Sequence, residues 1–290
     1  MKYIFIVNPV SGNKKHNHII ENIHKYMAIN DLEYEIIFTK AKGDATKIAK
    51  SFTSEKNIVI YSVGGDGTLN EIVNGIAGSN VRLGVIPAGS GNDFYKSLKI
   101  YKRKKRKIDL GKVNDKYFIN IASIGIDAEI CNNSNIFKKL KFPRSSIYDF
   151  SIIYTFFKFK YQNLKIEYKD EKYESKYLIV AVCNGKYYGG GYKIAPLASF
   201  DDNYFDVYFA NKVPKLKMIG LINLLKQAKH EESPVIKKVK LKELTISSNQ
   251  DIICNYDGET MISKKLEFKM IRDFIYIYNN QELVDNIIKK

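Results

Sequence analysis

Several features that would place the protein outside the cytosol are scarce or missing from its 290 residues. There are only three cysteines, Cys131, Cys183 and Cys254, which are far apart and form no C-x-x-C pair. This spacing argues against a structural zinc site and indicates a reducing compartment. The apolar run in MKYIFIVNPVSG is too short for a signal peptide, and no other run approaches the roughly 18 residues that span a bilayer. We therefore expect a cytosolic protein.

Acidic residues are scarce relative to basic ones. The 31 Asp and Glu stand against 47 Lys and Arg, which gives a formal net charge of +16. Such an excess attracts polyanions, whether nucleic acid, anionic lipid surfaces or phosphorylated ligands. The densest basic runs are 102–107, 137–144 and 237–242. Each run taken alone also fits a solvated face of a lysine-rich protein, so the charge does not identify the anion.

The first third of the chain alternates strand and helix patterns. Runs of apolar β-formers predict buried strands at 3–7, 34–40, 57–63 and 82–87. Apolar residues at helical spacing follow the first three strands, and Asp44 is the expected N-cap of the second helix. Repeated βαβ units predict a parallel, doubly wound sheet with helices on both faces.

Beyond about residue 107 short β-rich segments dominate, and helical stretches occur only around 145–160 and 214–229. Runs of strands without intervening helices predict a mainly antiparallel β-sandwich. We therefore expect an α/β domain at 1–106, a β-sandwich domain at 107–275, and a C-terminal segment at 276–290 that packs back on one of them.

The stretch VGGDGTLNE at 63–71 joins the third strand to its helix. Its glycines are Gly64, Gly65 and Gly67. They allow backbone angles and close approach that a Cβ would forbid, and their N–H groups at a helix N-terminus form an anion site. Thr68-x-x-Glu71 fits a capping box with Thr68 as N-cap, so Glu71 has a structural and a functional interpretation. The turn does not explain Asp66. A carboxylate beside a bound polyanion is unfavourable unless a divalent cation or a substrate proton lies between them.

Two further loops follow strands of the same predicted sheet. NPVSG at 8–12 follows the first strand, and PAGSGND at 87–93 follows the fourth. Loops at the carboxyl ends of parallel strands meet at one edge of the sheet, where ligands bind. Three Gly-, Ser- and Asn-containing loops at that edge predict a nucleotide site.

Two acidic motifs in the second half each allow two interpretations. Asp201-Asp202 fits either a hard-cation site with oxygen ligands or the turn before the next strand. Asp257-Gly258 is a preferred type I′ hairpin pair. Glu259 becomes a candidate general base only if the fold brings it to the phosphate loops.

Together these motifs resemble the bacterial diacylglycerol kinase and YegS-like lipid kinase family, which is related to sphingosine and ceramide kinases. The resemblance covers nearly the whole chain, with five motifs in that family's order. They are NPVSG at 8–12, GGDGTLNEIVNG at 64–75, PAGSGNDF at 87–94, YGGGYKIAP…DD at 188–202 and DGE at 257–259. GGDG alone also occurs in NAD kinases and phosphofructokinases, whereas the ordered combination is specific.

The resemblance implies ATP on the N-terminal domain, a lipid cleft between the domains, and Mg²⁺. Glu259 resembles the family's proton acceptor, with Asp66 nearby acting on magnesium or on the substrate hydroxyl. The implied ATP contacts are Asn8, Pro9, Val10, Ser11, Gly12, Thr39, Gly64, Gly65, Asp66, Gly67, Thr68, Leu69, Asn70 and Ser90. The implied structural magnesium site comprises Asp202 with backbone oxygens near Ser199 and Tyr204.

Two positions depart from the family's pattern. Where the family usually has Asp-Asp-Gly, this chain has Asp201-Asp202-Asn203. Asn tolerates a left-handed conformation better than most residues, so the turn can persist, but the change bears on metal binding. Ser90 stands where the family often has Thr, and a hydroxyl is kept.

The predicted function is transfer of the γ-phosphate of ATP to a lipid alcohol, with diacylglycerol as acceptor and phosphatidic acid as product. The alternatives are a kinase of a soluble acceptor such as NAD, a catalytically silent ATP-binding regulator, and a nucleic-acid-binding protein. No recognisable nucleic-acid module occurs, so we expect no nucleic-acid partner. The expected partners are the lipid substrate, an anionic membrane surface bound peripherally from the cytoplasmic side, and, from the resemblance alone, a second copy in a homodimer. The aromatic stretch at 150–159 is expected in the core, although it would also suit an acyl-chain cleft.

Overall fold

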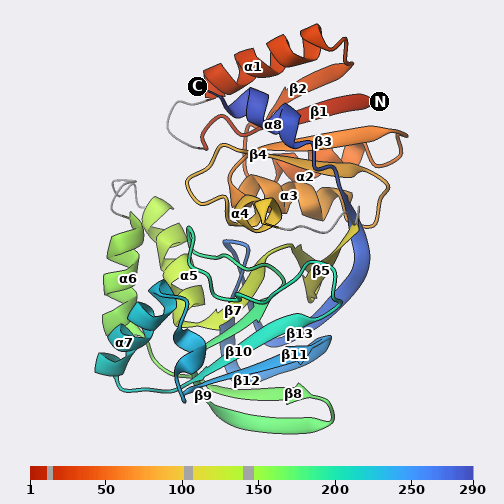
Figure 1. Cartoon of the computed structure of the whole chain (residues 1–290). Coiled ribbons are helices and arrows are strands. Elements are labelled where there is room, and N and C mark those ends of the chain that lie inside the picture. The colour runs from red at the N-terminus through yellow and green to blue at the C-terminus, as the bar shows by residue number, and fades with distance from the viewer. Residues whose placement is uncertain (12–15, 101–106, 140–146, 290) are drawn as a thin grey trace.

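The computed structural model describes residues 1–11, 16–100, 107–139 and 147–289, in two regions joined along one continuous sheet (Figure 1). In the N-terminal region four parallel strands lie in the order β2-β1-β3-β4. Their bounds are β1 Lys2–Val7, β2 Tyr34–Phe38, β3 Ile58–Gly64 and β4 Arg82–Pro87. All of β3 is buried, as its continuous apolar run predicts.

Helices cover both faces of this parallel sheet (Figure 1). Successive strand side chains point to opposite faces, so Ile4 and Ile6 pack with α2 and α3, whereas Phe5 and Val7 pack with α1 and α8. The helix bounds are α1 His16–Ile29, α2 Asp44–Ser51, α3 Asp66–Ile76, α4 Asp93–Lys99 and α8 Gln281–Ile288. The α/β architecture predicted for this part of the chain is confirmed.

The second region is mainly antiparallel and encloses its own apolar core, which includes Phe118, Phe205 and Phe268. Its strands are β5 Lys107–Val113, β6 Lys116–Phe118, β7 Ile121–Gly125, β8 Asn163–Tyr168, β9 Glu171–Cys183, β10 Phe205–Asn211, β11 Ile236–Leu241, β12 Glu243–Tyr256 and β13 Glu259–Ile277. Its helices are α5 Ile126–Lys139, α6 Ile147–Lys158, α7 Lys215–Lys226 and the short 3₁₀ helix η1 His230–Glu232.

The long strand β13 ties the two regions together. It pairs antiparallel with β12 and β5, and at its end pairs parallel with β4, with Tyr276 opposite Arg82 and Ile277 opposite Leu83. The chain then enters α8, which packs beside α1 (Figure 1). The beginning of β13 therefore lies in the second region and its end in the first.

Two elements differ from the sequence-based expectation. Helix α5 was not predicted, because 126–139 carries several asparagines of weak helix propensity and buries few residues. The basic run at 237–242 lies largely in β11, an edge strand of the sheet, where lysines discourage pairing with other chains. The runs at 102–107 and 137–144 fall mostly outside the described residues.

Candidate active site

The turns after β3 and β4 touch at their glycines. A Cβ on Gly89 would lie 2.4 Å from Gly65 Cα, and a Cβ on Gly64 would lie 2.6 Å from Thr68 Oγ1. A Cβ on Gly67, in contrast, would meet no heavy atom within 4 Å among those described. The three glycines of the β3–α3 turn have no positive φ. Gly64 and Gly65 serve close packing and Gly67 leaves open space, and none of them supplies the unusual backbone angles that the sequence also allowed.

The capping box predicted for Thr68 and Glu71 does not form, because α3 begins before Thr68. Thr68 Oγ1 instead accepts a hydrogen bond from Asn8 Nδ2 at 3.1 Å. The Glu71 carboxylate accepts the backbone N–H groups of Gly43 at 2.8 Å and Ala45 at 3.1 Å. Glu71 therefore caps the neighbouring helix α2. Its role is structural, as one of the two interpretations proposed, but the helix that it caps is α2 and not its own helix α3.

The sequence predicted Asp44 as the N-cap of α2, and this prediction is wrong. Gly43, with φ 86°, takes that position. Asp44 lies in the first turn, and its Oδ2 accepts the N–H groups of Lys40 and Ala41 at 2.8 Å each. These bonds lower the pKa of the Asp44 carboxyl. They also fix the loop between β2 and α2.

Replacing Glu71 by alanine should lower the free energy of unfolding by about 1–2 kcal/mol, because two N–H groups at the start of α2 lose their acceptor. Glu71→Gln keeps one acceptor oxygen and should retain much of that stability. Urea denaturation followed by circular dichroism measures both variants. Equal losses in the two would contradict the capping role.

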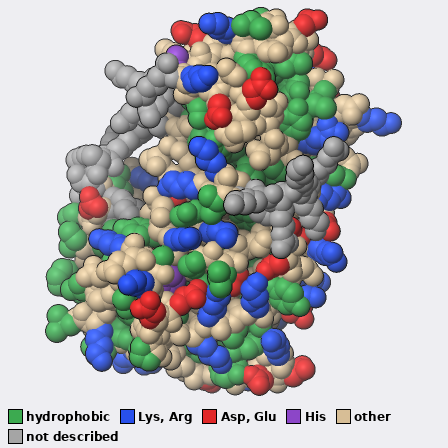
Figure 2. Space-filling view, viewed as in Figure 1, with side chains coloured by type: hydrophobic (Ala, Val, Ile, Leu, Met, Phe, Trp, Pro, Cys, Tyr) green, Lys and Arg blue, Asp and Glu red, His purple; other side chains and the backbone are tan. Residues whose placement is uncertain are grey.

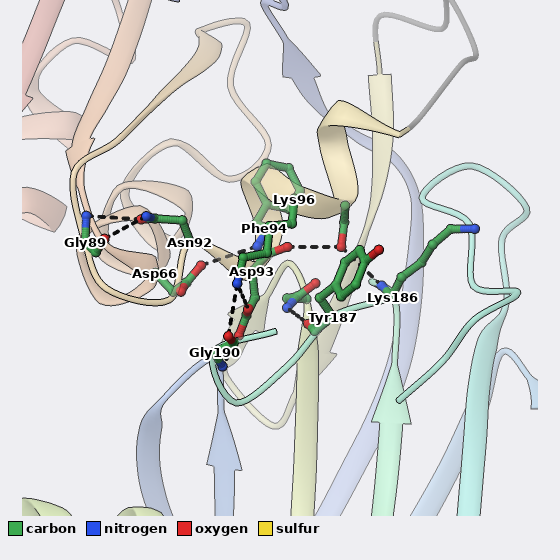
Figure 3. Close-up of polar contacts among 11 residues, drawn as sticks. Asp66, Gly89, Asn92, Asp93, Phe94, Lys96, Lys186, Tyr187 and Gly190 are labelled. Atoms are coloured by element: carbon green, nitrogen blue, oxygen red, sulfur yellow. Dashed lines mark hydrogen bonds and ion pairs between the residues drawn. The ribbon is translucent and has the colours of Figure 1, made fainter. Parts of the chain in front are cut away.

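Asp66 lies in the first turn of α3 and faces the turn after β4 (Figure 3). Its Oδ1 accepts the N–H of Phe94 at 3.3 Å. Burial raises the pKa of the Asp66 carboxyl, and the nearby Asp93 carboxylate raises it further. Asp93 is itself buried. Two neighbouring carboxylates beside a phosphate loop suit a hard cation.

The glycine triplet of the second region packs onto this pair. Gly190, one of three consecutive glycines with positive φ, donates its N–H to Asp93 Oδ2 at 2.8 Å. Its carbonyl accepts Lys96 Nζ at 3.1 Å, and Lys96 also lies 3.2 Å from Asp93 Oδ1 (Figure 3). The triplet thus fixes the second region against α4.

Asp257 and Gly258 form the β12–β13 turn with φ of 49° and 91°, as a type I′ turn requires. The buried Asp257 carboxylate accepts the three N–H groups of 119–121 at 2.6–3.0 Å, and Asn70 Nδ2 of α3 at 3.2 Å. Burial raises the pKa of Asp257 to about 6, and these donors act in the opposite direction. The turn is therefore bound to the helix of the phosphate loop, and Glu259 follows directly.

A buried polar cluster holds this turn from α5. Asp127 Oδ2 accepts Tyr188 Oη at 2.8 Å and Asn255 Nδ2 at 3.1 Å, and burial raises the pKa of the Asp127 carboxyl. Asn255 Oδ1 accepts the Gly258 N–H at 2.9 Å, and Cys131 Sγ donates to the Gly258 carbonyl at 3.2 Å. No sequence motif pointed to this cluster, because α5 itself was not predicted.

A cavity of about 310 Å³ lies among the loops after β1 and β2, the first turns of α3 and the start of β13, whereas the loop after β4 does not line it. Its lining residues are Asn8, Pro9, Val10, Thr39, Lys40, Ala41, Lys42, Ala45, Gly67, Thr68, Glu71 and Glu259. The structure thus brings Glu259 to the same space as the glycine-rich turn, which was the condition set for its role as a base.

The cavity receives only part of the predicted ATP set. Six members line it: Asn8, Pro9, Val10, Thr39, Gly67 and Thr68. Leu69 lies in the core, Asn70 holds Asp257, and Ser90 is exposed on the turn after β4. Ser11 donates its hydroxyl to the Asn8 carbonyl, and Gly12 lies outside the described residues.

Lys42 forms an ion pair with Glu259 across this cavity. The Lys42 side chain is 74% exposed and that of Glu259 is 23% exposed. Exposed pairs of this kind contribute little to stability, so the carboxylate can exchange its partner readily. Lys42 was not predicted, since nothing distinguishes it in sequence from the other lysines.

The structural magnesium site predicted at Asp202 stays a prediction, and the structure shows other partners for its residues. Asp202 Oδ2 lies 2.6 Å from Lys240 Nζ, and its Oδ1 accepts the Tyr204 N–H at 3.1 Å. The Ser199 hydroxyl donates to Asp201 Oδ1 at 2.7 Å. Within the part of the chain that the structure describes, no three His, Cys or acidic side chains gather as a metal site. Lys240 supplies the positive charge here, and the turn interpretation of Asp201-Asp202 agrees with the structure.

Comparison with known proteins identifies the family. Residues 2–117 match the family described as "Diacylglycerol kinase catalytic domain", and residues 120–277 match the "YegS C-terminal NAD kinase beta sandwich-like domain". The chain therefore belongs to the diacylglycerol kinase-like lipid kinase family, and the resemblance seen in its motifs is confirmed. It is an enzyme of the kinase class, for which ATP is the implied phosphate donor.

Individual relatives match over nearly their whole length. The "Diacylglycerol kinase" of Staphylococcus saprophyticus is 28% identical over 97% of this chain and 97% of its own. The "Diacylglycerol kinase" of Staphylococcus aureus strain MRSA252 is 29% identical over 97% of this chain and 95% of its own. A crystal structure from Bacillus anthracis str. Sterne superposes with a TM-score of 0.77 at 25% identity, covering 97% of this chain and 96% of that one. The two-part fold class predicted from the sequence is thus confirmed.

Proposed function

We propose that the protein transfers the γ-phosphate of ATP to the hydroxyl of a lipid alcohol, with diacylglycerol as acceptor and phosphatidic acid as product. The observation that supports this most directly is the shared cavity, which both Glu259 and the open backbone at Gly67 line. A phosphate cradle and a positioned proton acceptor are what transfer to an alcohol asks of the protein.

In this mechanism the phosphates of ATP occupy the space beside Gly67, against the N-terminus of α3. Lys42 turns from Glu259 toward the phosphate charge. Glu259 is then free to accept the proton of the acceptor hydroxyl as the hydroxyl oxygen bonds to the γ-phosphorus and the bond from that phosphorus to ADP breaks, so that ADP leaves. The transition state is loose, so positioning and charge neutralisation carry most of the catalysis.

Asp66 and Asp93 would hold the magnesium ion that accompanies ATP. Carboxylate oxygens suit a hard cation, which would replace Lys96 beside Asp93, and the Asp93 carboxylate raises the pKa of Asp66. Magnesium bound there would neutralise charge on the phosphoryl group. The structural magnesium predicted at Asp202 is not part of this mechanism and remains a separate prediction.

The acceptor lipid resides in a membrane, so the enzyme works at the cytoplasmic membrane surface as a peripheral protein. The formal net charge of +16 supports this, since each Lys or Arg near an anionic surface contributes about 1 kcal/mol. Among the described residues, no helix combines the length and the apolar character needed to cross a membrane.

The decisive experiment offers labelled Mg-ATP with diacylglycerol, monoacylglycerol, an undecaprenol-like alcohol, a sphingoid base and NAD in parallel, and identifies products by mass. We expect phosphorylated diacylglycerol. NAD is included because the second region matches a sandwich described as NAD kinase-like. Phosphorylation of NAD alone would overturn the lipid assignment, and ATP binding without transfer to any acceptor would indicate a regulator.

A further inference from the structure

Helix α6 has its apolar side facing outward. Ile153, Tyr154 and Phe157 are exposed, Phe157 to 69%, whereas Ser151 and Thr155 on the opposite side are buried. Both buried hydroxyls have hydrogen-bond partners. A surface helix normally buries its apolar stripe and exposes its polar one. Ile147 is also buried and Phe156 packs on the core, so α6 carries more apolar residues than the fold covers.

Helix α7 continues the same feature. Leu216 is 83% exposed and Ile219 and Ile222 are also exposed, while Met218 points inward. The two helices meet where Lys215 Nζ donates to the Phe157 carbonyl at 2.8 Å. Figure 2 shows hydrophobic side chains along the edge of the molecule formed by α6 and α7. We name the exposed apolar residues the docking face: Ile153, Tyr154, Phe157, Leu216, Ile219 and Ile222.

Positive charge surrounds the docking face. Helix α7 contains no acidic residue, and α6 contains only Asp149, in its first turn. The lysines of the two helices are Lys158, Lys215, Lys217 and Lys226. Apolar side chains flanked by lysines are the pattern of helices that lie in the headgroup region of anionic membranes.

We propose that the docking face inserts into the surface of a bilayer containing anionic phospholipid, with these lysines against the headgroups. The purpose of this contact rests on the proposed lipid-kinase function, although its test does not. A second copy of the chain is a poorer occupant, because its own lysines would face these. Helix α5 connects α6 to the candidate site: α6 packs on α5, and Cys131 of α5 contacts Gly258, next to Glu259.

The chain has no tryptophan, so one introduced tryptophan reports on its own position alone. We would place it at Phe157 and, as matched control, at Ile29, which is 72% exposed at the end of α1. Both variants are mixed with vesicles of equal phosphatidylglycerol and phosphatidylcholine, with and without brominated acyl chains. Phe157→Trp should shift its emission to the blue and be quenched by bromine, and Ile29→Trp should show neither change.

Sedimentation with the same vesicles gives the affinity. Phe157→Ser and Leu216→Ser should each weaken binding about tenfold, because each removes a large apolar side chain from the lipid. Ile29→Ser should bind like the wild type. If the protein sediments with the vesicles but the emission of Phe157→Trp does not change, the lysines alone account for binding and the proposal is overturned. A vesicle-free blue shift that grows with protein concentration, together with a doubled mass, would assign the face to a second copy instead.

The kinase assay separates the two proposals. With diacylglycerol dispersed in detergent micelles, Phe157→Ser should turn over like the wild type, whereas on vesicles at limiting lipid its rate should fall with its weaker binding. If no lipid is phosphorylated in any form while the Phe157→Trp variant is still quenched, the proposed function fails and the docking face stands. If diacylglycerol is phosphorylated but no quenching occurs, the docking face fails alone.

Discussion

Glu259→Gln should lower kcat on the lipid acceptor by about 10²–10⁴-fold, the usual contribution of a positioned proton acceptor. The amide keeps the size of the side chain and its place in the cavity, but it cannot take up the hydroxyl proton. The substitution also removes the ion pair with Lys42, which is exposed and contributes little to stability. Circular dichroism and thermal unfolding should therefore match the wild type.

Two further variants isolate the cause of that loss. Glu267→Gln makes the same change further along β13, where the side chain is 60% exposed, and should retain full activity. Lys42→Met removes the ion pair while leaving Glu259 in place, and should raise KM for ATP with a smaller effect on kcat. A kcat near the wild-type value in Glu259→Gln would remove the assignment of Glu259 as the base. Equal losses of kcat in Glu259→Gln and Lys42→Met would mean that catalysis depends on the ion pair between the two residues.

The features predicted well from the sequence depend on local patterns. The apolar runs gave the four parallel strands within a few residues, because a buried parallel strand reads as a continuous run of β-formers. The Asp257-Gly258 pair gave the type I′ turn, because both positions need positive φ. Asn203 likewise adopts φ 62°, which keeps the left-handed turn expected there.

The features predicted wrongly depend on partners far away in the chain. Thr68 and Glu71 have capping-box spacing, but Glu71 lies close enough to the start of α2 to serve that helix instead. No local pattern encodes which of two helix N-termini a carboxylate reaches. The ion pair between Asp202 and Lys240 has the same origin, because Lys240 reaches that carboxylate from an edge strand, and metal binding at Asp202 stays a prediction.

The aromatic stretch at 150–159 shows a third limit. Its aromatic composition predicted that the stretch lies in the core. Helix α6 nevertheless exposes Ile153 and Phe157 and buries Ser151 and Thr155. Sequence periodicity identifies the apolar side of a helix but not the direction in which that side faces. The structure resolves this: Thr155 Oγ1 accepts Asn133 Nδ2 of α5, and Ser151 Oγ donates to the Ile147 carbonyl of its own helix, so both hydroxyls can be buried.

Asp66→Asn should reduce turnover on the order of 10²–10³-fold, the scale seen when one preorganised electrostatic group is removed from such a site. The fold should not suffer, because Asn Oδ1 can still accept the Phe94 N–H. Burial and the Asp93 carboxylate both raise the pKa of Asp66, so its charge opposes folding. The neutral amide removes that opposition.

The pH dependence of stability tests this account independently of activity. A carboxyl whose folded pKa is raised stabilises the fold most at low pH, and that contribution is lost as pH rises through the folded pKa. Asp66→Asn should therefore have a higher Tm than the wild type near neutral pH, and the difference should shrink as the pH approaches the ordinary Asp value of about 4. Asp115→Asn is the matched control: Lys116 lowers the pKa of that exposed carboxyl, so no gain in Tm is expected, and activity should be intact. An inactive Asp66→Asn with a lower Tm would mean that Asp66 supports the fold, and an active one would leave the magnesium role to Asp93.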